Sequence, residues 1–117
     1  MAAYLAVKTK NMIKKACGNT ELEFDLKNIN INGNKRGCSG FVRNKENGVV
    51  VYIDTERCSG CSFLGYMFRY AKDFKDYTGC INQWRNDFDN YITGIKEALQ
   101  NEKRYNGELI SCKKVTA

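Results

Sequence analysis

The sequence predicts one α+β domain, in which three helices pack against a small antiparallel or mixed sheet of about four strands. The chain has 117 residues, of which 43% are hydrophobic, and this is enough for a single core. Segments with helical and with strand-like hydrophobic periods follow one another along it. Glycine and asparagine separate these segments. The expected order is α-β-β-β-α-α-β within one domain over residues 1–117.

The first half of the chain predicts a helix followed by three strands. Apolar residues recur at helical spacing from Ala3 to Cys17, and Gly18 can end that helix. Residues 22–31 alternate apolar and polar side chains, as a half-buried strand does. The five β-prone residues at 49–53 carry no charge, which indicates a central strand covered on both faces. A return strand is expected over residues 35–43, with turns at 32–34 and 44–48.

The second half predicts two helices and a short last strand. Aromatic and aliphatic residues of segment 63–78 fill about half of a helical circumference, and Ser62 can cap this helix. Segment 82–104 places Trp84 and further apolar residues at helical spacing. The last strand is expected over residues 108–115.

Positive charge is concentrated in the N-terminal part of the chain. Residues 1–45 hold nine Lys and Arg against three acids, which accounts for the whole net charge of +6. Such asymmetry is typical of a surface that meets nucleic acid or an acidic protein. The alternative interpretation is a solvated helix whose lysines flank its buried stripe.

Histidine is absent from the sequence, which removes the commonest general base and the commonest nitrogen ligand for metals. A Ser-His-Asp or Cys-His hydrolase is therefore excluded within this chain. No phosphate-loop or dinucleotide-binding glycine motif occurs. Carboxylates such as Asp87 and Asp89 do not share a helical face. We therefore expect no catalytic residue and a protein that is not an enzyme.

The motif Cys58-Ser59-Gly60-Cys61 is the most specific chemical signal in the sequence. A C-x-x-C pair with an internal glycine is typical of a zinc knuckle and also of a redox dithiol, while plain buried thiols are the third interpretation. The N-terminal residues lack the pattern of a signal peptide. We therefore expect a cytoplasmic protein with reduced thiols and no membrane partner, in which a metal site is favoured over disulfides.

The expected fold predicts two further zinc ligands in addition to Cys58 and Cys61. If Arg43 faces Val49 across the turn at 44–48, Cys38 lies opposite Asp54, a few residues from the C-x-x-C pair. The helix over 82–104 returns the chain toward that pair, which makes Cys112 the best fourth candidate. Four thiolates would form a closed, structural Zn²⁺ site made of Cys38, Cys58, Cys61 and Cys112. The fourth position stays open to Cys80, Cys17 or a carboxylate such as Asp54 or Glu56.

Two motifs, VYIDTE at 51–56 and RYAKDFKDYTG at 69–79, resemble a small accessory domain encoded by phages and conjugative elements of Gram-positive bacteria. With its size and cysteine set, the chain is similar to zinc-containing anti-CRISPR proteins of streptococcal phages. This resemblance implies a viral protein for evasion of host defence. It would bind the recognition lobe of a type II RNA-guided nuclease as a monomer and hinder the loading of target DNA.

The surface expected to contact a partner combines basic side chains with two tyrosines as anchors. Each tyrosine, taken singly, also fits a core residue whose hydroxyl reaches water. The alternative function is a zinc-knuckle module of a mobile element whose basic half follows the phosphates of a nucleic acid. The candidate contact residues are Lys8, Lys10, Lys14, Lys15, Lys35, Arg36, Arg43, Tyr66 and Tyr70.

Overall fold

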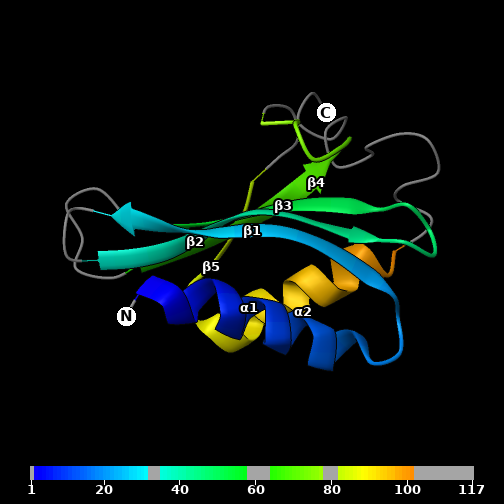
Figure 1. Ribbon diagram of the computed structural model, residues 1–117, viewed down its shortest axis with the longest axis horizontal. Helices are drawn as coiled ribbons and strands as arrows, with labels where there is room; N and C mark the ends of the chain where they lie inside the picture. Colours follow the sequence, from blue (N-terminus) through cyan, green and yellow to red (C-terminus); the bar gives the residue numbers. More distant parts are fainter. Residues whose placement is uncertain (1, 32–34, 58–63, 78–81, 102–117) are drawn as a thin grey trace.

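The computed structural model describes residues 2–31, 35–57, 64–77 and 82–101. Within these residues, five antiparallel strands form one sheet whose strand order follows the sequence, and both helices pack on the same side of it (Figure 1). The α+β class is confirmed, but the described residues form five strands and two helices instead of the four strands and three helices predicted. The elements are α1 (Ala2–Cys17), β1 (Leu22–Ile31), β2 (Lys35–Asn44), β3 (Val50–Arg57), β4 (Leu64–Ala71), β5 (Gln83–Arg85) and α2 (Phe88–Leu99).

The predicted first helix, first hairpin and central strand are confirmed. Gly18, with φ +63°, follows α1 in the left-handed conformation that commonly ends helices. β1 pairs with β2 over its whole length. Successive residues of β3 are buried on opposite faces of the sheet, which explains the uncharged run at the start of this strand.

The predicted helix over residues 63–78 is wrong, because residues 64–71 form β4 between β3 and β5. Tyr66, Phe68 and Tyr70 face the helices, whereas Met67 and Ala71 belong to the cluster on the opposite face. A strand that buries apolar side chains on both faces has no polar alternation, so its sequence also fits an apolar helix. The strong β-propensity of Tyr and Phe was the signal that favoured the strand.

The predicted helix over residues 82–104 is too long at its N-terminal end. Gln83–Arg85 form the edge strand β5, and α2 begins after Asp87, whose carboxylate accepts a hydrogen bond from Asn90 N at 2.8 Å. Trp84, which the helical pattern placed on a buried stripe, lies in β5 opposite Met67. The predicted strand over 108–115 lies outside the described residues.

The turn between β2 and β3 differs from the prediction by one residue. Asn44 remains in the ladder, where its N–H donates to Val49 O at 2.8 Å, so that Arg43 pairs with Val50. Ser39, and not Cys38, therefore lies opposite Asp54. Since neighbouring residues of a strand point to opposite faces, Cys38 and Asp54 project from opposite sides of the sheet.

The same turn also caps the C-terminal end of α2. The side-chain amides of Asn44 and Asn47 both donate to the Leu99 carbonyl, at 2.9 and 3.0 Å. A carbonyl in the last turn of a helix has no partner within that helix. The β2–β3 turn thus fixes one end of α2 on the sheet, while Ile95 and Leu99 are buried against its strands.

Candidate partner-binding surface

α1 separates buried and charged side chains sharply. Thr9, Ile13 and Cys17 are buried beneath it. Its four lysines are exposed, and the helix contains no acidic residue. We call this surface the lysine face; it consists of Lys8, Lys10, Lys14 and Lys15.

The charge of the lysine face is not neutralised within the described part of the chain. The ion pairs there are Arg43 Nη1 to Glu23 Oε1 at 2.7 Å and Lys45 Nζ to Glu21 Oε2 at 3.3 Å. Lys8 Nζ lies 5.3 Å from the centre of the Phe88 ring, and Lys10 Nζ lies 5.6 Å from that of Phe24. Such contacts orient the lysine stems and leave the ammonium groups available to an external anion.

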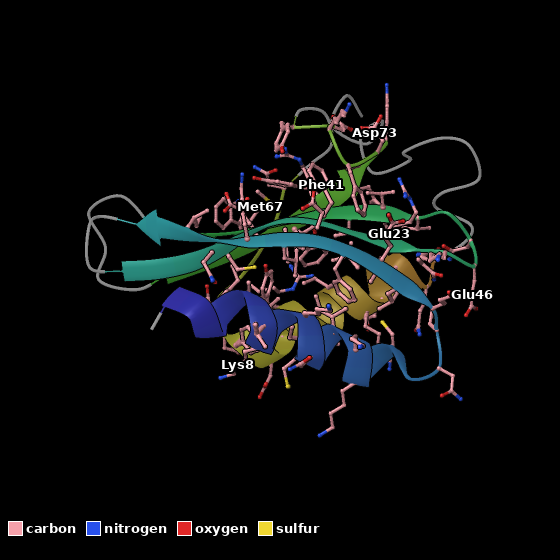
Figure 2. All side chains as sticks on the ribbon, in the orientation of Figure 1. Lys8, Glu23, Phe41, Glu46, Met67 and Asp73 are labelled. Carbon is pink, nitrogen blue, oxygen red and sulfur yellow. The ribbon has the colours of Figure 1, made fainter. Side chains whose placement is uncertain are left out.

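Arg43 is separated from the lysine face by the sheet. It is paired with Glu23, and its guanidinium lies 4.5 Å from the centre of the Phe74 ring. Phe74 packs against a cluster on the sheet face that carries neither of the described helices, which we call the helix-free face. The buried members of this cluster are Phe41, Val50, Tyr52, Met67 and Ala71. Figure 2 places Phe41 and Met67 on the side of the sheet opposite to Lys8. The side chains of Lys35 and Arg36 lie outside the described residues.

Both candidate tyrosines lie on the helix side of the sheet. Tyr70 is 7% exposed and belongs to the main core. Tyr66 is half-buried, with its ring centre 5.0 Å from that of Tyr91 and 5.8 Å from that of Phe88. These positions are those of residues that pack the helices on the sheet.

The helix-free face carries exposed aromatic side chains that sequence reasoning missed. Tyr77 is 60% exposed and makes edge contacts with the rings of Phe41 and Tyr52. Trp84 is 50% exposed on β5. The guanidinium of Arg69 lies 4.4 Å from the centre of the Tyr52 ring. Reading residues 64–71 as a strand would have placed Arg69 on this face.

Of the four predicted zinc ligands, Cys38 alone lies within the described residues. It is 1% exposed, on the helix side of the sheet. Burial raises the pKa of its thiol to about 11, although a hydrogen bond with the Thr9 side chain opposes this shift and the nearby Asp54 charge adds to it. Cys58, Cys61 and Cys112 lie outside the described residues. Across the described ranges, no group of three or more metal-ligating side chains comes together.

The two other cysteines considered as ligands have different positions. Cys17 is buried at the end of α1, where burial raises the pKa of its thiol and the charge of Lys96 opposes the shift. Cys80 lies outside the described residues. Asp54, considered as a carboxylate ligand, projects from the face opposite to Cys38.

Within the ranges that the structure describes, neither helix has the length and hydropathy needed to cross a membrane. No protein family, no curated protein and no solved structure was found to match the chain.

Proposed function

We propose that this protein is a cytoplasmic, non-enzymatic inhibitor that binds an acidic surface of a type II RNA-guided nuclease and hinders the loading of target DNA. The lysine face of α1 is the observation that carries the proposal. Four exposed lysines stand on one helix without an acidic residue, and no described carboxylate forms an ion pair with them. A rigid surface that carries charge of one sign favours a partner of opposite charge and accelerates the encounter with it.

The positive charge of the lysine face limits which site on the nuclease the inhibitor can occupy. The nucleic-acid channel of an RNA-guided nuclease is itself positively charged, so a basic helix would be repelled from it. Mimicry of the target DNA is therefore not part of the proposal. The inhibitor would bind an acidic patch of the recognition lobe and obstruct DNA loading from there, as a monomer.

The alternative is a nucleic-acid-binding module of a mobile element, which the same lysines favour because they would pair equally well with phosphates. Proteins that bind single strands combine such charges with aromatic rings on which the bases stack. Here the exposed Tyr77 and Trp84 belong to the helix-free face, whereas the lysines lie on the helix side. This separation makes the nucleic-acid module the second choice.

A structural zinc site remains part of the proposal. Cys38, Cys58, Cys61 and Cys112 would hold Zn²⁺ as thiolates, and the bound metal would supply folding free energy and no catalysis. The positive charge of the metal would favour the thiolate form of Cys38, against the effect of burial.

The test measures binding to separate ligands: the nuclease without guide, the guide-loaded nuclease, duplex DNA and single-stranded RNA. The proposal expects a complex of defined stoichiometry with the nuclease and reduced loading of target DNA. Reversing Lys8 and Lys15 to Glu should weaken that complex at least tenfold. Reversing the exposed Lys72 and Lys75, which follow β4 in the chain, is the matched control and should leave it unchanged. Binding to DNA or RNA alone would replace this function by the alternative.

A further inference from the structure

β1 forms an open edge of the sheet. All ten of its residues pair with β2 on one side, and within the described ranges no strand pairs with its other side. Figure 1 shows this edge in front, with α1 beneath it. The strand has neither the short length nor the proline by which proteins commonly protect an edge. The side chains at positions 22–29 of β1 are exposed or half-buried, whereas those at positions 50–53 of β3 are buried.

The hydrogen-bond pattern shows which groups this edge offers. Lys45 N donates to Glu21 O at 2.9 Å, directly before β1 and in the register of the β1–β2 pair. In an antiparallel ladder every second residue bonds to the neighbouring strand. Odd-numbered residues of β1 thus bond to β2, and the even-numbered residues direct N–H and C=O outward. Among them are Leu22, Phe24, Leu26 and Asn28.

A groove accompanies the first half of this edge. Its volume is about 240 Å³, and it is lined by Lys10, Lys14, Gly18, Thr20, Leu22 and Phe24. Leu22 and Phe24 provide an apolar floor, and the two lysines provide positive charge on the helix side. On the opposite side of the strand, Asp25 is exposed and negative, Glu23 is already paired with Arg43, and Lys27 is exposed and positive.

We propose that the edge of β1 accepts an extended peptide segment of a partner protein as a sixth strand. Such a strand alternates its side chains between the two faces. Its helix-side positions would carry acidic and apolar residues, which meet Lys10, Lys14 and the groove. Its other positions would carry basic residues, which meet Asp25. The recognised segment is therefore one in which acidic and basic side chains alternate.

A second copy of the chain is a poorer occupant of this edge. Pairing of two β1 strands would place the lysine-bearing α1 helices of both copies beside the shared edge, and each copy carries a net charge of +6. Two such copies repel each other. The inference is independent of the nuclease proposal, because it concerns the chemistry of the edge and not the identity of the partner.

Two synthetic peptides of equal composition test the inference by NMR titration of the full chain. The first is Thr-Glu-Lys-Val-Lys-Glu-Thr-Val, in which the valines share a face with the glutamates. The second exchanges every Glu with Lys, so that the valines share a face with the lysines. The first peptide should bind about tenfold more tightly. It should also slow the hydrogen exchange of the outward amides of Leu22, Phe24, Leu26 and Asn28.

Matched variants separate recognition from nonspecific attraction. Lys10→Glu combined with Lys14→Glu should reverse the preference between the two peptides. Lys72→Glu combined with Lys75→Glu reverses the same number of charges away from the groove and should leave the preference unchanged. Circular dichroism would verify that each variant is folded.

Three results would overturn the inference. The first is equal binding of both peptides or binding of neither. The second is binding that perturbs the lysines without protecting the outward amides of β1. The third is protection of these amides that rises with protein concentration in the absence of peptide, which would assign the edge to a second copy. Because the nuclease binding assay is separate, each proposal can fail without the other.

Discussion

The backbone of Gly40 in β2 lies so close to Asp25 in β1 that a Cβ atom on residue 40 would overlap the Asp25 carbonyl oxygen. Gly40 has φ +149°, a backbone conformation that residues other than glycine rarely adopt. Two independent constraints therefore require glycine here. Gly40 thus marks a place where two backbones approach each other closely.

Gly40→Ala should consequently lower the free energy of unfolding by about 3 kcal/mol or more, because the clash involves backbone and cannot be relieved by a rotamer change. Urea unfolding followed by circular dichroism measures this loss. Gly18→Ala is the control: Gly18 is also left-handed, but it has open space around it. That change should cost only about 1 kcal/mol. Equal losses for both variants would contradict the steric explanation.

The contacts of Asn44 with α2 predict a second effect on stability. Asn44 is buried, and its side chain donates to Leu99 O and accepts from Glu46 N, each at 2.9 Å. Asn44→Ala should cost about 1–3 kcal/mol. Asn47→Ala should lower the free energy of unfolding by less, because Asn47 is only half-buried. The double variant should lose more free energy of unfolding than the sum of the two single losses. Strict additivity in a thermal or urea unfolding series would contradict a shared role at Leu99.

Burial raises the pKa of Tyr52, and a hydrogen bond with Ser39 partly opposes the shift; Ser39 Oγ lies 3.2 Å from the Tyr52 hydroxyl oxygen. The unfolded chain therefore loses this proton at a lower pH than the folded protein does. The resulting contribution to stability is complete below pH 10 and decreases as the pH rises toward the folded-state pKa. Tyr52→Phe should make unfolding less sensitive to pH in this alkaline range. The free energy of unfolding, measured in urea at pH 9 and above pH 10, checks this prediction. An equal change with pH in the wild type and in the variant would contradict it.

The zinc proposal predicts about one metal ion per chain after purification under reducing conditions. Elemental analysis measures this content. Replacing Cys58 and Cys61 by Ser should abolish it, and Cys38→Ala should do the same if Cys38 is a ligand. Cys17→Ala is the matched buried control and should retain the metal. A folded wild-type preparation free of metal would remove the zinc site from the proposal.

The sequence predicted the elements in which one face alone is apolar, and also β3, whose uncharged run of Val, Tyr and Ile favours a strand over a helix. α1 and β1 have clear periods of this kind, and both were found at nearly the expected boundaries. β4 was missed because the sheet is covered on both faces there, and a strand with that environment shows no alternation. The predicted helix over residues 82–104 included the residues of β5, because the position of Trp84 fits the spacing of the apolar residues on a helix. The register of Cys38 was missed because Asn44 stays in the strand through contacts with α2 that are distant in sequence.

The candidate site was predictable only in part. The charge of residues 1–45 indicated α1 as a candidate surface, and the structure places four exposed lysines on this helix. Arg43 could not be separated from them by sequence, because its side of the sheet depends on the pairing of β2. The open edge of β1 was also beyond sequence reasoning, since an edge is a property of the whole strand order.

The strict sequence order of the strands has a consequence for folding during synthesis. Each strand pairs with the one made just before it, so the sheet can grow from β1 as the chain leaves the ribosome. α2 is made after all five strands. Until it docks, Val51, Ile53 and Phe68 of the growing sheet lack the side chains of Tyr91, Ile95 and Leu99 that cover them in the finished protein. α2, the last helix within the described residues, thus closes the core, and we expect the nascent chain to be most prone to aggregation just before that step.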